Sequence, residues 1–274
     1  MKISTEAEAA AVEQRLRKML LEFNIDPDAT FAILIQTRSF ISGSIGTAVL
    51  ATVRFKPNDV DVYCPVEHET TMVNFVEQVL GFTPEKSRDD AYPEYGVLHR
   101  IYWYRKGKAN LNLMIVQGED AALAVFHFHL TIVMNIVCGN GVYCAYPEMM
   151  EERVGVLNSS VINGRVRVSR TKNCMYKYRG RGFTFQPWDP KTRCIIECEL
   201  HQCQVDADCP GTTRSIHDEY GKFYPINRED SRLGNNKDNA ENEAPMQNHS
   251  VEWRLGGPAC LPDGAYQSRF ARVA

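Results

Sequence analysis

Apolar residues recur at intervals of three or four positions in two stretches of the chain, which predicts two amphipathic helices. In residues 5–23, Thr5 and Glu8 have the spacing of a capping box at the start of a helix. The apolar side chains of this stretch that share one helical face are Val12, Leu16, Met19, Leu20 and Phe23. The second stretch, 67–80, is followed by Gly81, the residue type that most often caps a helix C-terminus.

Short runs of apolar and β-branched residues predict strands between and after these helices. The runs are 40–42, 59–63, 97–104, 110–116 and 142–147. The third and fourth are joined by 105–109, which fits a hairpin turn around a glycine. Residues 46–52 and 148–157 fit helices, 30–38 fits either a helix or a strand, and the polar stretch 83–96 fits a loop.

The strand pattern at 59–63 carries two acidic residues. Asp59 and Asp61 are two positions apart, so they project from the same face of a strand while Val60 and Val62 face the core. Two neighbouring carboxylates repel, and each raises the pKa of the other unless a cation lies between them. Carboxylate pairs suit Mg²⁺, which often takes one or two protein carboxylates together with substrate phosphates. We therefore expect Mg²⁺ at Asp59 and Asp61.

A Gly-Ser turn at Gly43 and Ser44 precedes this Asp-x-Asp strand. The combination resembles the signature of the DNA polymerase β-like nucleotidyltransferase superfamily, over about a third of the chain from Ile33 to Val116. The resemblance implies that Gly43 and Ser44 hold the phosphates of a nucleotide and that Asp59 and Asp61 hold the metal.

The same resemblance implies an α/β fold, with a small mixed sheet flanked by helices over residues 1–157. It also implies a third carboxylate on the strand 110–116, but Asn112 stands there. An amide oxygen can ligate Mg²⁺, yet it adds no charge and is a poor general base. Glu119 and Asp120 lie just beyond the strand, as substitutes or as ordinary loop residues.

Two functions follow from this pattern. The first is Mg²⁺-dependent transfer of a nucleotidyl group from an NTP to an unknown acceptor. The second is a catalytically inactive module that keeps the fold to bind a nucleotide or another protein. Asn112 favours the second, because it leaves the site one negative charge short.

The composition is that of a globular protein: 274 residues, 44% hydrophobic, 24% charged, with a net charge of −3. Residues 165–193 depart from this balance, with nine Lys or Arg and one acidic residue among aromatics. Such a segment can contact nucleic acid, a triphosphate or a protein acceptor. Within it, residues 178–183 fit a flexible basic loop. The alternative for the segment is a solvated hairpin with its aromatics in the core.

The region 158–274 also carries a cluster of cysteines. Four of the nine, Cys194, Cys198, Cys203 and Cys209, fall within sixteen residues and could together bind Zn²⁺, although none forms a CxxC pair. The alternative is reduced thiols. The polar stretch 230–250 predicts a disordered loop, and 251–255, which contains Trp253, predicts a segment that docks on the core.

The chain offers no pattern for a membrane or a secretory route. Its first residues are charged and lack the apolar stretch of a signal peptide. Its longest apolar runs, such as 130–137, are too short to span a bilayer. We therefore expect an intracellular protein. Two histidines, His127 and His129, stand between aromatics and fit either packed or ligating side chains.

Overall fold

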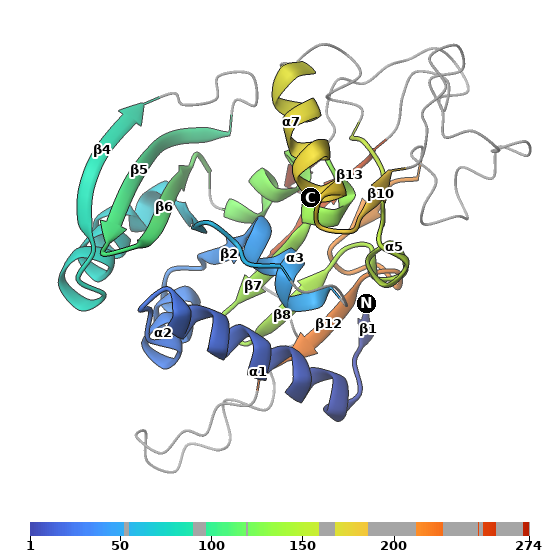
Figure 1. Ribbon diagram of the computed structural model, residues 1–274, viewed down its shortest axis with the longest axis horizontal. Coiled ribbons are helices and arrows are strands. Elements are labelled where there is room, and N and C mark those ends of the chain that lie inside the picture. The colour runs from blue at the N-terminus through green and yellow to red at the C-terminus, as the bar shows by residue number, and fades with distance from the viewer. Residues whose placement is uncertain are drawn as a thin grey trace, which may run out of the picture.

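The computed structural model describes residues 1–51, 55–89, 97–118, 120–158, 168–185, 212–226, 246, 249–255 and 271–273. Its centre is a nine-stranded mixed sheet flanked by helices (Figure 1), which confirms the predicted α/β class. In spatial order the strands are β1 (Lys2–Ile3), β12 (Lys222–Pro225), β8 (Gly141–Cys144), β7 (Asn135–Cys138), β2 (Phe40–Ser42), β3 (Val60–Pro65), β6 (Ala109–Val116), β5 (Leu98–Lys106) and β4 (Thr83–Asp89). The β1–β12 and β3–β6 pairs are parallel, and the other neighbours are antiparallel.

The N-terminal helices cover one face of the sheet. They are α1 (Glu6–Glu22), α2 (Pro27–Gln36), α3 (Ser44–Leu50) and α4 (Glu69–Asn74), which continues as the π-helix η2 (Phe75–Val79). The predicted capping box is confirmed, because Thr5 and Glu8 cap α1 reciprocally. Leu16 and Leu20 of α1 are fully buried and belong to the core that the sheet forms on this side. Residues 30–38, which fitted either a helix or a strand, lie largely in the helix α2.

A second apolar core fills the opposite face. It joins side chains of the central strands to the 3₁₀-helix η3 (Ala121–His127) and to β13 (Val251–Trp253). The Trp253 ring stacks on Phe126 with 3.9 Å between centroids and donates its Nε1–H to the Tyr146 hydroxyl at 2.8 Å. The predicted docking of 251–255 is therefore confirmed.

Short elements complete the described chain. They are η1 (Val66–His68), η4 (Thr131–Val133), α5 (Pro147–Glu152), β9 (Val154–Gly155), α7 (Val168–Arg179), β10 (Thr184–Phe185), β11 (Arg214–Ser215) and β14 (Ala271–Val273). β9 pairs with β10, while β11, β13 and β14 form a small antiparallel sheet. No helix within the described ranges is long and apolar enough to cross a bilayer.

Three sequence-based predictions about secondary structure are wrong. The loop expected at 83–96 is in its first half the strand β4, whose residues are all exposed and whose pairing comes from β5. The helix expected over 148–157 ends at Glu152, since Arg153 takes a left-handed conformation with φ 60° and β9 follows.

The third wrong prediction is the hairpin considered within 165–193, because residues 168–179 form the helix α7. The loop predicted at 178–183 is present in part, since residues 180–182 form a turn directly after this helix. The buried side of α7 is anchored by Tyr178, which packs edge-on against the rings of Phe55 and Phe183. Residues 165–167 and 186–193 of the segment, the four cysteines Cys194, Cys198, Cys203 and Cys209, and nearly all of 230–250 lie outside the described residues.

Candidate functional site

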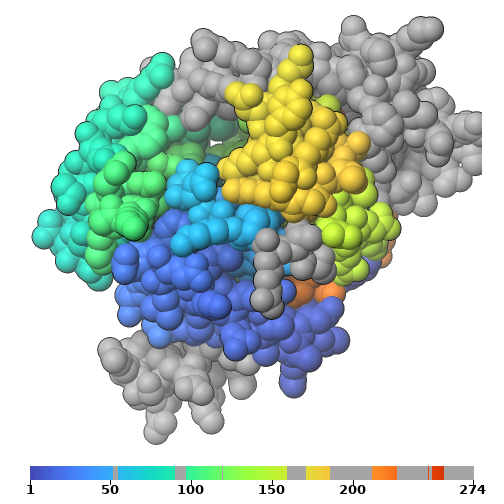
Figure 2. Space-filling model, viewed as in Figure 1, coloured from blue at the N-terminus to red at the C-terminus, as the bar shows by residue number. Residues whose placement is uncertain are grey.

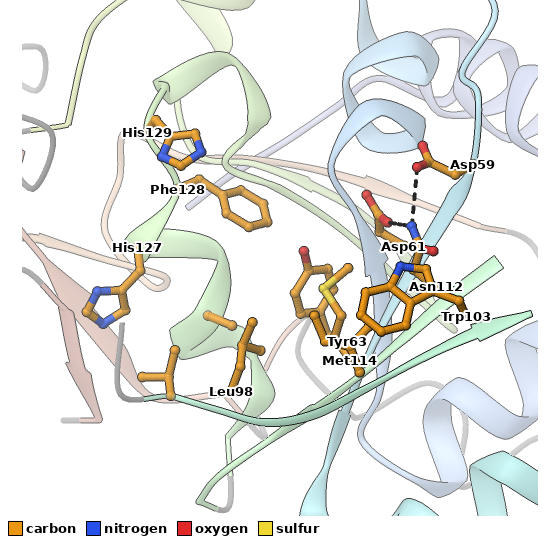
Figure 3. Close-up of a pocket in the computed structure, with 13 residues that line it drawn as sticks. Asp59, Asp61, Tyr63, Leu98, Trp103, Asn112, Met114, His127, Phe128 and His129 are labelled. Carbon is orange, nitrogen blue, oxygen red and sulfur yellow. Dashed lines mark hydrogen bonds between the residues drawn. The ribbon is translucent and has the colours of Figure 1, made fainter. Parts of the chain in front are cut away.

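The two aspartates and Asn112 meet at the centre of the sheet. Asp61 on β3 is the register partner of Asn112 on the parallel strand β6 and of Ser42 on the antiparallel strand β2. Asp59 precedes the first residue of β3 and lies on the same side (Figure 3). Parallel pairing of β3 and β6 thus brings together residues that are more than fifty positions apart in the chain.

One nitrogen atom joins both carboxylates. The side-chain amide Nδ2 of Asn112 donates to Asp61 Oδ1 at 2.8 Å and to Asp59 Oδ2 at 3.2 Å. The positive end of the amide dipole therefore occupies the place between the two carboxylates where a cation is expected. The amide oxygen points away from them, so in this arrangement it cannot ligate the same metal ion.

The carboxyl group of Asp61 resists ionisation. Burial in the sheet and the neighbouring charge of Asp59 raise its pKa to about 7, against the opposing effects of the Asn112 hydrogen bond and the positive charge of Lys177. Strongly shifted carboxyl groups in cavities are characteristic of functional sites.

The Gly43–Ser44 turn lies directly against Asp61. Gly43 has φ 66° and ψ −131°, a conformation that glycine alone adopts without strain. A Cβ atom at Gly43 would stand only 2.7 Å from Asp61 Oδ2. Ser44, the first residue of α3, has a buried hydroxyl with no hydrogen-bond partner among the described residues. The structure therefore places the turn beside the Asp-x-Asp pair.

A cavity of about 300 Å³ opens from the two aspartates. Asp59, Asp61 and Asn112 lie at one end of it, beside Trp103 (Figure 3). Aromatic and aliphatic side chains line the middle, and the far end has two histidines. The lining residues beyond the polar end are Tyr63, Val97, Leu98, Ile101, Met114, Ala124, His127, Phe128 and His129.

Sequence reasoning did not single out the aromatic wall of this cavity. Tyr63 continues the alternation of Asp59 and Asp61 along β3, and Trp103 on β5 is the register partner of Asn112. The alternation along β3 could therefore have placed Tyr63 in the cavity, and the hairpin of β5 and β6 could have placed Trp103 there. Phe128 had no such signal, because it follows a 3₁₀-helix that only tertiary packing brings to β3, where its ring meets Tyr63 with 5.8 Å between centroids.

The substitute carboxylate considered beyond β6 has another role. Asp120 is buried and accepts from the backbone N–H of Ser250 at 3.0 Å, with its other oxygen 2.8 Å from Nδ1 of His249. Asp120 thus anchors the segment 249–255, and its side chain does not line the cavity. Glu119 lies outside the described residues.

The basic helix α7 brings a positive charge within reach of the aspartates. The charge of Lys177 lowers the pKa of Asp61, which places the two groups within electrostatic reach. Arg181, just after the helix, stacks over Phe55 at 4.2 Å, and its Nη1 is buried without a hydrogen-bond partner in the described part of the chain. Lys177 is therefore the cation of this helix that acts on the aspartates.

The donor set fits Mg²⁺ better than a softer metal. Asp59 and Asp61 offer hard oxygen ligands, and Mg²⁺ is commonly bound through two carboxylates with substrate phosphates completing its shell. No group of three or more His, Cys, Asp or Glu side chains suited to a metal occurs among the described residues. Asp59 and Asp61 would therefore be the protein ligands, with a nucleotide providing others.

Comparison with known proteins does not identify a relative of this chain. No protein-family model, curated protein or solved structure matches it. The function must therefore be inferred from the arrangement of side chains in the site.

Proposed function

We propose that the cavity binds a nucleoside triphosphate together with Mg²⁺, in the manner of a DNA polymerase β-like nucleotidyltransferase. A single observation carries this proposal. Asn112 stands where the resembled family has its third carboxylate. Its side-chain nitrogen donates to both Asp59 and Asp61, beside the Gly43 turn.

The triphosphate is expected at the polar end of the cavity. Mg²⁺ held by Asp59 and Asp61 would neutralise charge on the phosphate oxygens. Ser44 has a hydroxyl with no hydrogen-bond partner in the described part of the chain, and it would donate a hydrogen bond to a phosphate oxygen. Lys177 supplies positive charge from α7. These groups bind and orient the phosphates.

The base is expected along the aromatic wall. Trp103 borders the carboxylates, and Tyr63 and Phe128 lie deeper in the cavity (Figure 3). Aromatic side chains stack on any base, so this wall provides affinity without strong preference among the four nucleotides.

Turnover is expected to be weak. Asn112 gives the site no third negative charge and cannot act as a general base, a role that contributes about 10²- to 10⁴-fold in rate. We therefore propose nucleotide binding as the main function and nucleotidyl transfer as a weaker activity. The raised pKa of Asp61 supports nucleotidyl transfer, because a pair of carboxylates that destabilises the metal-free fold is typical of an active site.

Thermal shift and calorimetric titration with ATP, GTP, CTP and UTP, with and without Mg²⁺, test the proposal. Asp59→Ala/Asp61→Ala should lower the Mg²⁺-dependent affinity at least tenfold and stay folded. Glu151→Ala/Glu152→Ala is the matched control, because it removes two exposed carboxylates from α5. Unchanged Mg²⁺-dependent affinity in the aspartate variant, or no response of the wild type to any NTP, would contradict the proposal.

A further inference from the structure

In the edge strand β4 the acidic residues have ion-pair partners, whereas the basic residues have none among the described residues. Its acidic residues are neutralised, because Glu85 pairs with Arg105 at 2.7 Å and Asp89 pairs with Arg100 at 2.5 Å. Its basic residues, Lys86 and Arg88, form no ion pair within the described residues, and every residue of β4 is exposed. The edge therefore presents two uncompensated positive charges.

Both basic side chains are on the cavity side of the sheet. Lys86 is the register partner of Trp103, and Arg88 is the register partner of Ile101. Direct partners in an antiparallel pair project from the same face, and both partners line the cavity. The Lys86 ammonium lies 4.8 Å from the centroid of the Trp103 ring. Lys86 and Arg88 thus extend the aromatic wall to the edge of the sheet.

Among the described residues, this wall lies along a recess. β4 is the outermost strand (Figure 1), and Figure 2 shows the atoms of β4, β5 and β6 standing across a recess from those of α7. At the level of Asp61 the register runs through Asn112 and Trp103 to Lys86. Three inter-strand steps separate the first residue from the last, about 14 Å at the usual spacing of 4.8 Å. The surface changes from acidic to basic over that distance.

We propose that Trp103, Lys86 and Arg88 form a binding surface for single-stranded nucleic acid. An indole ring with an ammonium group beside it matches the two parts of a nucleotide, since a base stacks on the ring and the attached phosphate meets the cation. Stacking on a side chain requires an unpaired base, which selects single strands over duplexes. An acidic peptide would satisfy the cations but would offer no planar group to stack on the indole.

Fluorescence anisotropy with labelled 15-nucleotide U and dT strands, titrated between 50 and 200 mM salt, measures this binding. Lys86→Ala/Arg88→Ala should weaken it about tenfold at 50 mM salt. It should also reduce the slope of log K against log salt by about 1.4, since each phosphate contact to a single strand contributes about 0.7. Lys18→Ala/Lys108→Ala, which removes two exposed lysines from α1 and the β5–β6 turn, should change neither quantity.

Trp103 provides the second arm of the test. Trp103→Leu should weaken binding about tenfold with an unchanged salt slope, because base stacking contributes about 1 to 3 kcal/mol without releasing counterions. Trp103→Phe should retain most of the affinity. Thermal melts check that each variant is folded.

Three results would overturn the proposal. They are no oligonucleotide binding by the wild type at 50 mM salt, wild-type affinity and slope in Lys86→Ala/Arg88→Ala, or displacement of the strand by polyglutamate at equal concentration. Failure of NTP binding is separate from these outcomes, since Asp59→Ala/Asp61→Ala should not weaken oligonucleotide binding and Lys86→Ala/Arg88→Ala should keep the NTP response.

Discussion

The side-chain amide of Asn112 donates to Asp61 at 2.8 Å across the parallel strands β3 and β6, and the same nitrogen reaches Asp59 at 3.2 Å. Two carboxylates this close need a positive partner, and the amide hydrogens supply part of that role without a metal ion. The pair is therefore tolerated in the metal-free protein, although the pKa of Asp61 remains raised.

Asn112→Asp should make the fold depend on metal. The substitution replaces two hydrogen bonds by repulsion among three carboxylates, so the metal-free variant should lose about 2 to 4 kcal/mol of stability. Added Mg²⁺ should raise its melting temperature more than that of the wild type. The measurement is a thermal melt over a Mg²⁺ series.

The same variant tests the weak turnover expected of the wild type. Asn112→Asp is nearly isosteric and returns the third charge, so NTP consumption should rise in assays with RNA, DNA or protein acceptors. Strong wild-type turnover that the variant does not improve would show that Asn112 does not occupy the place of the missing carboxylate.

Asp61→Asn should stabilise the metal-free protein at pH 8. A raised folded-state pKa means that the folded protein binds the proton more tightly than the unfolded chain, so stability falls as the pH rises from about 4 to about 7. Removing the ionisable group abolishes that loss, by about 1 to 2 kcal/mol after allowance for solvent screening. Chemical unfolding at pH 8 and pH 5 should show a gain at both pH values that is clearly smaller at pH 5, because most of the loss in the wild type occurs between pH 5 and pH 7.

The gain from Asp61→Asn should be accompanied by weaker Mg²⁺-dependent NTP binding. A variant that is both less stable at pH 8 and unchanged in NTP affinity would exclude the assigned role of Asp61.

Gly43→Ala should destabilise the protein more than Gly81→Ala. Both glycines have positive φ, 66° and 69°, so alanine is strained at either position by about 1 to 3 kcal/mol. At Gly81 a Cβ atom meets nothing within 4 Å, whereas at Gly43 it stands 2.7 Å from Asp61 Oδ2. Only Gly43→Ala should also weaken NTP binding. Equal losses of stability and unchanged affinity in the two variants would argue against a turn packed on Asp61.

Asp120→Asn should weaken the docking of the C-terminal strand β13 at neutral pH. Burial by itself would raise the pKa of Asp120, but the hydrogen bond and charge of His249 and two backbone N–H groups hold it below its ordinary value. The stabilisation is therefore present above the ordinary pKa and is lost as the pH falls through the folded-state pKa. We expect a loss of about 1 to 3 kcal/mol at pH 7.

Urea unfolding followed by near-ultraviolet circular dichroism, which reports the stacked Trp253, checks this loss. The difference from the wild type should shrink as the pH falls from 5 to 3. Asp28→Asn, an exposed partner of Arg17, is the control and should cost less than about 1 kcal/mol at any pH. A pH-independent difference would mean that the charge of Asp120 is not what holds the strand.

Local patterns along the chain were enough for the helix α1 with its capping box, the hairpin of β5 and β6, and the strand that carries Asp59 and Asp61. These features depend on neighbours within a few positions, and hydrophobic periodicity and capping record such contacts directly. The α/β class of the fold was implied by the family resemblance that the Gly-Ser turn and the Asp-x-Asp pattern carry.

Tertiary pairing alone decided the strand β4 and the helix α7. β4 is polar and exposed, and it is a strand because β5 offers an edge for hydrogen bonding. α7 lies in a basic segment for which the sequence predicted no helix, and the packing of Tyr178 against Phe55 and Phe183 buries one side of it. The site depends on the same long-range contacts. The register between β3 and β6 places Asn112 where it donates hydrogen bonds to both Asp59 and Asp61. Local sequence patterns do not encode which strands pair or in which register, so this role could be found only in the tertiary structure.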